Sequence, residues 1–350
     1  MAAGRRRNKS LECRSAARIA SASLTCIDPA GPPDPILSAL RFSTRSMVIH
    51  RRTMSLGILF MGGLCLGMAP VIVKSVALAP EISAFYRVLL AAPAFAAFAW
   101  LFPATPTKVA SSPPRAFILL YALTAISFAA DLALMHVSIR MTNVALATLF
   151  TNCAPFFVGL MGLFGLSDRP TRRFWQALPV ALLGILLLIG LSGLSDGAVA
   201  GNLLGLCAGM FYGGYLVCVR ALRARGAPPA VLMVWVSAGS AALLAPLFVA
   251  AGAPVPADPR TWALLAVLVL AGQVAGQGLV TIALRELPAS LGSIVLLIQP
   301  VAAAGLSWAL LSETLSGLQV FGMALVLVAI GTATMAPSIS PKDVSANGFK

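Results

Sequence analysis

Charged side chains are scarce in this chain of 350 residues. Asp and Glu together number 11, and charged residues make up 10% of the chain, whereas apolar residues make up 59%. A soluble domain is about a quarter charged and under half apolar, so this chain lacks the charges that a soluble surface requires. Uncharged stretches of about twenty residues recur, which is the length that crosses roughly 30 Å of hydrocarbon. The composition predicts an integral membrane protein.

Cysteine and histidine are also few, at 6 and 2 residues, and no Cys-x-x-Cys or zinc-type spacing is present. Four of the cysteines lie in apolar runs, where Cys behaves as a small hydrophobic residue. We therefore expect no disulfide, no metal and no cofactor. No HExxH motif or P-loop is present either, so the sequence provides no ATP site.

The net charge of +14 does not indicate nucleic-acid binding. Ten of the basic residues lie within residues 1–53, and most of the others lie in short loops between apolar runs. Basic loops in a membrane protein report its orientation. We expect no nucleic-acid partner; the expected partners are a small-molecule substrate and the lipid bilayer, and a homodimer is left open.

Ten apolar segments follow one another and are each long enough to cross the bilayer once. They lack the alternation of barrel strands, so we expect an all-α integral membrane fold with ten transmembrane helices. The segments are 54–73, 82–102, 116–138, 142–165, 174–193, 199–220, 229–251, 261–284, 288–311 and 316–335.

Loop charges predict the orientation. From residue 54 onward, eleven Lys and Arg residues lie on the side of the N-terminus and only three on the other side, namely Lys74, Arg140 and Arg260. Lys and Arg concentrate in cytoplasmic loops. We predict a multi-pass protein of the cell inner (cytoplasmic) membrane with both termini in the cytoplasm.

The first 53 residues differ from the rest, since they are rich in Arg and Ser and lack the apolar core and cleavage site of a signal peptide. We predict a basic, disordered and dispensable tail. A transit peptide is an alternative, and so is translation that begins at Met47 or Met54. Residues 337–350 are predicted to form a cytoplasmic C-terminal tail.

An internal repeat is visible around two prolines. Pro155 precedes Asp168 by thirteen residues, Pro300 precedes Glu313 by thirteen, and each acid closes a Leu-Ser-acid triplet. The common offset of 145 residues indicates a duplication of five helices. Because five is odd, the second copy must cross the membrane in the opposite direction, an arrangement typical of secondary carriers.

We accordingly predict two inverted five-helix repeats, over residues 54–195 and 196–336.

The chain resembles the drug/metabolite transporter superfamily in its EamA-type, ten-helix branch, over about residues 54–335. The stretches that carry the resemblance are Phe85-Tyr86-Arg87, Ala145 to Pro155, Asp168-Arg169-Pro170-Thr171, Gln299-Pro300 and Leu311-Ser312-Glu313. The family more often has Glu where this chain has Asp168. The resemblance implies a carrier of metabolites with a midplane cavity lined by helices 1, 3, 4, 6, 8 and 9; it does not identify the solute.

Asp131 is the first candidate for a functional residue, because it lies well inside the third apolar segment. A charge near the bilayer centre costs about 2.5–3.5 kcal/mol on insertion scales and is rarely idle. The carboxylate could take up a proton or bind a cationic group; a fixed ion pair is the structural alternative.

Arg87, in the second apolar segment, could neutralise Asp131, bind an anionic group of a substrate or extend to the membrane interface. His136 could relay a proton or mark the helix end.

Amides and aromatic residues in the apolar segments supply further candidates. Amides can orient a substrate without a charge penalty, or only join helices; tyrosines can contact a flat substrate, or mark an interface. These residues are Asn152, Gln273, Gln277, Gln299, Tyr212 and Tyr215. Pro155 and Pro300 are predicted to kink their helices, which frees carbonyls for a cavity or merely bends the helix for packing.

The predicted function is secondary active transport of small metabolites (amino-acid-, vitamin- or drug-like solutes) by alternating access, with proton coupling through Asp131 as a hypothesis. We predict that the protein is not an enzyme. A non-transporting receptor or scaffold is an alternative. An intramembrane hydrolase is another alternative, based on the string Gly190-Leu191-Ser192-Gly193. It is the weaker of the two, because a serine nucleophile needs a base nearby and both histidines precede the serine in the sequence.

Overall fold

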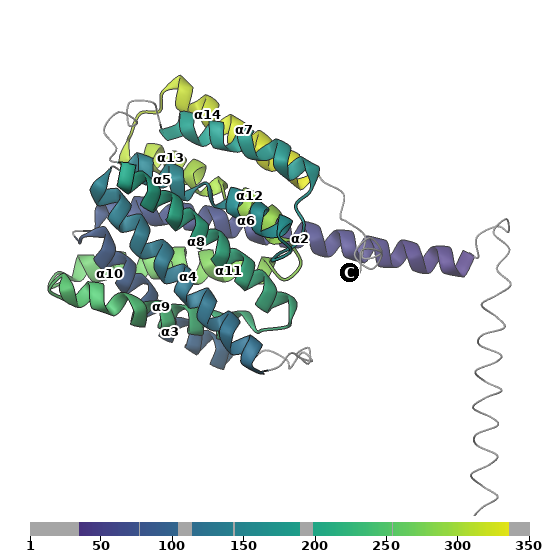
Figure 1. Ribbon diagram of the computed structural model, residues 1–350, viewed down its shortest axis with the longest axis horizontal. Helices are drawn as coiled ribbons and strands as arrows, with labels where there is room; N and C mark the ends of the chain where they lie inside the picture. The colour runs from purple at the N-terminus through teal and green to yellow at the C-terminus, as the bar shows by residue number, and fades with distance from the viewer. Residues whose placement is uncertain are drawn as a thin grey trace, which may run out of the picture. The chain divides into compact units, whose positions relative to one another are not determined.

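The computed structural model describes residues 35–76, 78–103, 114–142, 144–189, 199–253 and 255–335, and within these ranges the regular structure is entirely helical (Figure 1). The elements are α2 (Pro35–Ser75), α3 (Pro80–Leu101), α4 (Pro114–Met141), α5 (Val144–Thr151), α6 (Ala154–Leu163), α7 (Arg172–Ile189), α8 (Val199–Ala224), α9 (Pro229–Ala250), α10 (Pro259–Val267), η2 (Leu268–Gln277), α11 (Gly278–Ala283), α12 (Ala289–Val295), α13 (Ile298–Leu311) and α14 (Gly317–Thr334).

In the described part of the chain, ten stretches of helix are long and apolar enough to cross a membrane, in agreement with the predicted number of spans. Three of them are composite. α5 and α6 share the span Leu146–Leu163, α10, η2 and α11 share Pro259–Ala283, and α12 and α13 share Ala289–Leu311. The predicted all-α membrane fold is therefore correct.

The helix α2 begins within the segment predicted to be a basic tail. Residues Arg51–Lys350 form one unit and residues Met1–His50 another, and the helix α2 already begins at Pro35. Residues 35–53 of the predicted tail therefore lie in the first part of this helix, and the boundary between the two units falls three residues before the predicted one. Pro35 is well placed at a helix start, and the residues that follow it up to the first span contain no further proline or glycine. Residues 1–34 and 336–350 lie outside the described part of the chain.

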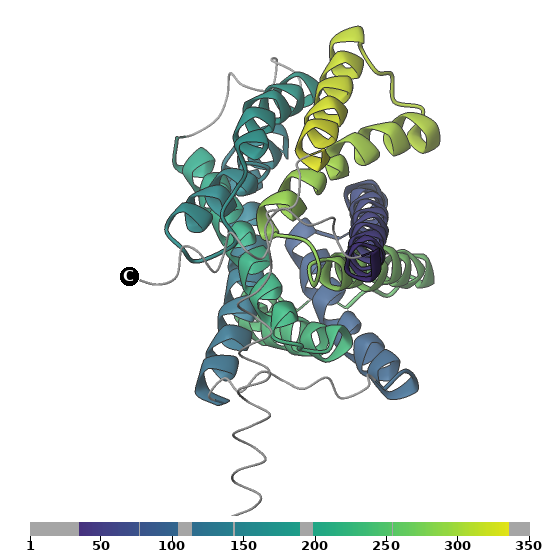
Figure 2. The same cartoon turned by 90° about the vertical axis from the view of Figure 1, so that its right-hand side faces the viewer.

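Within the unit Arg51–Lys350, the main helix contacts have counterparts between the equivalent helices of the other half. α7 lies beside α14 along one edge (Figure 1), and α3 packs against α9. α4 packs against α8 and α9, and, in the same way, η2 packs against α2 and α3. Figure 2 shows α2 end-on beside the green helix that contains η2. This pairing is that of two related five-helix halves.

Glycines bring the helix backbones into contact at equivalent places in the two halves. A β-carbon on Gly67 of α2 would lie 2.7 Å from the carbonyl oxygen of Gln299, and one on Gly213 of α8 would lie 3.1 Å from that of Ala154. The two carbonyls are 145 residues apart, the offset of the sequence repeat. Small residues permit this approach in membranes, where packing rather than water drives association.

The fourth and ninth spans are both interrupted just before a proline. α5 gives way to α6 at residues 152–153, and α12 gives way to α13 at residues 296–297. Pro155 and Pro300 have no N–H to donate, and their rings clash with the carbonyl four residues earlier. At each interruption the backbone N–H, of Cys153 and of Leu297, bonds to the carbonyl three residues earlier instead. The two broken helices thus share one cause.

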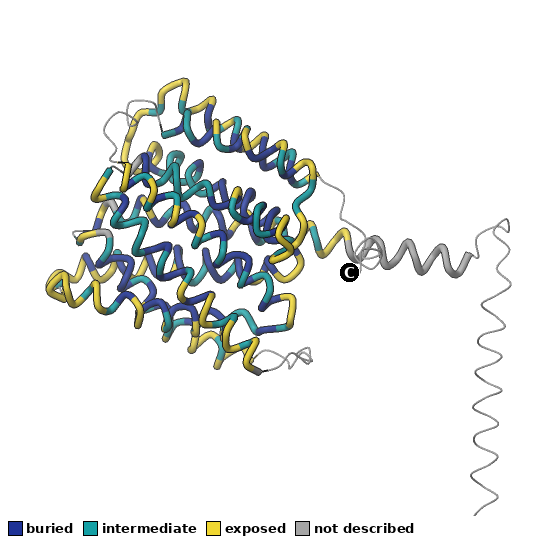
Figure 3. The backbone as a smooth tube through the Cα atoms, viewed as in Figure 1, coloured by how far each residue is buried: buried dark blue, intermediate teal, exposed yellow. Residues whose placement is uncertain are grey.

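The outer surface of the bundle is apolar. Large hydrophobic side chains are exposed along the outer helix faces, whereas residues toward the middle are buried (Figure 3). Trp100, Phe164 and Trp308, for example, are all more than half exposed. Such a surface suits lipid, because hydrocarbon does not penalise exposed apolar groups. The structure is therefore that of a multi-pass membrane protein.

The crossing of α7 and α14 provides a test of the packing. A β-carbon on Gly322 would lie 2.6 Å from the carbonyl oxygen of Gly184 and 2.7 Å from the backbone nitrogen of Leu188. We expect Gly322→Ala to lower the free energy of unfolding by about 1–3 kcal/mol, because the two backbones must separate. Thermal unfolding of the detergent-solubilised protein measures this loss.

Gly331→Ala on the same helix is the matched control, since a β-carbon there meets nothing within 4 Å. It should leave stability unchanged or raise it by up to about 1 kcal/mol through helix propensity. Equal stability of the two variants would contradict the close contact at Gly322.

Candidate functional site

A polar cluster lies within the bundle, where five helical elements contribute one or two side chains each. The charges of Arg87 and Asp131 act on one another and on both Tyr212 and Tyr215. The members of this polar cluster are Arg87 on α3, Asp131 on α4, Tyr212 and Tyr215 on α8, Gln277 on η2 and Gln299 on α13. The structure thus brings together six of the side chains that the sequence proposed.

Three polar atoms of the cluster are buried without a hydrogen-bond partner in the described part of the chain. They are Nε of Arg87, Oδ1 of Asp131 and Oη of Tyr212. Asp131 itself is only 6% exposed, and no ion pair with Arg87 shorter than 4.0 Å is formed. Burial of a polar group without a partner costs free energy, so native structures rarely leave one in this state. Unmet donors and acceptors from three helices therefore point to a ligand.

Aromatic rings form one wall of the cluster. Tyr212 and Tyr215 stack with ring centroids 5.9 Å apart, and Phe128 on α4 packs on Tyr215 at 4.8 Å. The hydroxyl of Tyr215 donates a hydrogen bond to Oε1 of Gln277 at 3.2 Å. The hydroxyl of Tyr212 lies beside the amides of Gln277 and Gln299 but forms no well-directed bond with either. Tyr215 is therefore held in place, whereas the hydroxyl of Tyr212 is available.

A π-helical segment, η2, carries both glutamines of the eighth span. It extends over ten residues, from Leu268 to Gln277. π-helical turns are rare and occur frequently at functional sites. Gln273 is fully buried in it, and neither its amide oxygen nor its amide nitrogen has a partner in the described structure. The sequence placed Gln273 and Gln277 on one face but contained no signal for the π-helix.

Asn152 and His136 have local partners instead. Nδ2 of Asn152 donates to the carbonyl of Thr148, one turn earlier in its own helix, at 2.8 Å. Nδ1 of His136 bonds to the carbonyl of Leu132 on its own helix. Within the described residues, neither is joined to the polar cluster by a hydrogen bond.

A pocket of about 190 Å³ lies at one end of α3, α4 and α9, and Asp131 is not among its lining residues. Its lining includes Glu81, His136 and Arg140, and the last of these forms an ion pair of 3.3 Å with Glu81. The ion pair shows that the start of α3 and the end of α4 share one end of the bundle, as the predicted topology requires. No member of the polar cluster lines this pocket.

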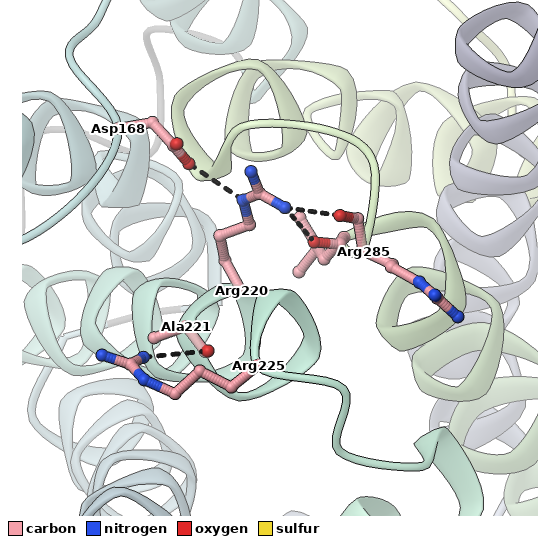
Figure 4. A network of polar contacts seen from close by, with 6 residues as sticks. Asp168, Arg220, Ala221, Arg225 and Arg285 are labelled. Atoms are coloured by element: carbon pink, nitrogen blue, oxygen red, sulfur yellow. Dashed lines mark hydrogen bonds and ion pairs between the residues drawn. The ribbon is translucent and has the colours of Figure 1, made fainter. Parts of the chain in front are cut away.

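The opposite end of the bundle holds a network that the sequence did not predict (Figure 4). Arg220, near the end of α8, bonds to the carboxylate of Asp168 and to the carbonyls of Leu284 and Arg285. Arg223, one turn further along, is buried and donates to the carbonyls of Thr281 and Ala227. In the sequence, Arg220 and Arg223 are three residues apart at the end of an apolar segment, and this pattern indicated only a basic cytoplasmic loop.

The weak hydrolase motif at residues 190–193 lies outside the described part of the chain.

Comparisons with known proteins agree with the fold. The model of the EamA-like transporter family matches residues 53–190 and again residues 199–335. A crystal structure described only as that of a protein aligns with a TM-score of 0.68 at 17% identity, covering 81% of this chain and 97% of the other. Among curated proteins none matches.

Two successive matches to one family model, each covering five of the ten spans, confirm both the predicted duplication and the predicted resemblance. The chain belongs to the EamA-like transporter family.

Proposed function

We propose that this chain is a secondary carrier of small polar metabolites and that the solute binds at the polar cluster. The observation that carries the proposal is the set of three buried polar atoms, on Arg87, Asp131 and Tyr212, that have no partner in the described structure. A solute with hydrogen-bonding groups would satisfy all three. A bundle that serves only as a scaffold has no reason to bear the cost of leaving them unmet.

The chemistry of the polar cluster favours a solute that carries a cationic and an anionic group, or at least one charge beside a flat or apolar body. The guanidinium of Arg87 suits a carboxylate or phosphate group. The carboxylate of Asp131 suits an amine or a proton. The stacked rings of Tyr212 and Tyr215 offer an apolar wall. Amino-acid-, vitamin- and drug-like molecules combine such groups.

Alternating access follows from the inverted halves. Two related halves can exchange conformations about a site near the bilayer midplane, which opens that site first to one side and then to the other. The interrupted helices before Pro155 and Pro300 free backbone carbonyls at equivalent positions of the two halves. Because the sequence contains no ATP site, an ion or solute gradient supplies the energy, and Asp131 is the proposed proton carrier.

Removal of the charge at Asp131 tests the coupling. We expect Asp131→Asn to abolish the pH dependence of solute flux in proteoliposomes, because an amide cannot exchange a proton in this range. The solute is first found by a thermal-shift screen of amino acids, carboxylates, amines and nucleosides. Flux is then measured with and without a pH gradient.

Glu81→Gln is the matched control, since Glu81 is also an acid near a basic residue but lies in the pocket at the end of the bundle. It should retain the pH dependence of the unaltered protein. If solute flux in Asp131→Asn still depends on pH, coupling through Asp131 is refuted. If the unaltered protein binds the solute but does not transport it, the alternative function as a receptor is favoured.

The two tyrosines should respond differently to loss of the hydroxyl. In Tyr212→Phe we expect solute affinity to fall about two- to tenfold with an unchanged melting temperature, because the Tyr212 hydroxyl has no partner in the described protein. In Tyr215→Phe we expect a lower melting temperature, because Gln277 loses its donor. Titration calorimetry and thermal unfolding measure the two effects; the reverse pattern would exclude Tyr212 as a solute contact.

A further inference from the structure

We propose that Arg220 and Asp168 form a latch that closes the end of the carrier predicted to face the cytoplasm, and that this latch must open in each transport cycle. This inference rests on the proposed function as a carrier. It concerns a different part of the molecule from the polar cluster, where the ends of α6, α8 and α11 meet the start of α12.

Arg220 joins three segments of the chain through one side chain. Its Nε lies 2.9 Å from Oδ2 of Asp168, in the turn that follows α6. Its Nη1 lies 3.2 Å from the carbonyl oxygen of Leu284 and 2.5 Å from that of Arg285, at the end of α11 (Figure 4). A cation at a helix C-terminus is favourable because it meets carbonyls without helical partners. Arg220 is thus fixed to the second half and binds Asp168 of the first half.

An apolar layer lies just inside the latch. Val158 on α6, Val217 on α8 and Ala289 on α12 form a separate buried cluster, against which Met161 packs. Val217 precedes Arg220 by three residues, so the two side chains share one face of α8. The layer joins the two halves at the same end as the ion pair. Solvent from this end therefore meets a charged contact and then an apolar one.

The position of these two layers along α8 relates them to the proposed binding site. Tyr215 belongs to the polar cluster and Arg220 to the latch, five residues later on the same helix. At 1.5 Å per residue, the two lie about 7.5 Å apart along the helix axis. A solute at the polar cluster can leave at this end only after Asp168 separates from Arg220 and Val158 separates from Val217.

The sequence repeat carries the same charges at the opposite end. Asp168 corresponds to Glu313 at the offset of 145 residues that relates Pro155 to Pro300. Arg220 corresponds to Lys74 at the offset of 146 that relates Gly213 to Gly67. Both signs of charge are retained, although the second copy crosses the membrane in the opposite direction. If the same kind of latch closes the carrier at each end in turn, both copies of the repeat are expected to retain an acid and a base at these positions, as they do.

Arg225 provides a matched control for the test. It lies just past the same end of α8 and has the same charge, but its Nη1 bonds, within the described residues, only to the carbonyl of Ala221 on that helix, at 2.9 Å (Figure 4). Arg223 is unsuitable, since its bonds to Thr281 and Ala227 stay within the second half. Loss of charge at Arg225 therefore changes the local potential as loss at Arg220 does, without breaking a contact between the halves.

The experiment measures how readily a thiol in the apolar layer reacts from the side of the latch. Val217→Cys is introduced into the full chain in inside-out vesicles, and a membrane-impermeant maleimide is added. The labelling rate is taken above that of the chain without the added cysteine. We expect Asp168→Asn and Arg220→Gln to raise the rate by roughly two- to tenfold, because the closed state loses an ion pair and the open state does not.

The double variant should label no faster than Arg220→Gln alone, since both changes remove one interaction. Arg225→Gln should label at the original rate. Asp168→Asn leaves the carbonyl bonds of Arg220 in place, so it remains informative where Arg220→Gln lowers stability.

Unchanged labelling in Asp168→Asn and Arg220→Gln, or an equal rise in Arg225→Gln, would overturn the latch. The assay contains no solute, so its result is independent of whether the polar cluster binds one, which the thermal-shift screen decides.

Discussion

Backbone contact at small residues is the constraint on which the structure depends. Lipid offers no hydrophobic drive for one apolar helix to join another, so association relies on close packing. The chain meets this requirement with glycines at the crossings, such as Gly67 against Gln299, Gly213 against Ala154, and Gly184 against Gly322. Each crossing fixes the register of two helices. The register of α8 in turn places its tyrosines beside Phe128 and the acid of α4.

The packing of the ten spans is related by symmetry between the two halves, but the residues of the polar cluster are not. The first half supplies an acid, Asp131, at the place where the second half supplies Gln277, within one residue of the equivalent position. The helix that carries Asp131 is regular, whereas the helix that carries Gln277 is π-helical there. One buried acid beside one partly buried arginine keeps the formal charge of the pair at zero. A second acid at the equivalent place would add an uncompensated charge to the interior.

The polar residues of the bundle fall into two groups that differ in how fully their bonding capacity is met. At the ends of α8 and α11, the arginines meet carbonyls and a carboxylate, and their contacts hold segments together. In the polar cluster, donors and acceptors remain without partners in the described structure. Satisfied groups stabilise a conformation, and unmet groups favour whatever supplies a partner. Under the proposed function, the satisfied contacts define the states of the carrier and the unmet groups bind its solute.

The sequence alone determined the membrane class, the ten spans and the duplication, and it proposed all six members of the polar cluster as candidates, because a bilayer imposes length, hydropathy and burial rules that act locally along the chain. It did not reveal that α2 begins at Pro35, that η2 is π-helical, or that Asn152 bonds within its own helix. It also did not distinguish Arg220, which joins the two halves, from Arg225, whose side chain bonds to the carbonyl of Ala221 on the adjoining helix. Only the tertiary structure decided these points, because a side chain's partner is set by the helix packed against it, and that neighbour is distant in the sequence.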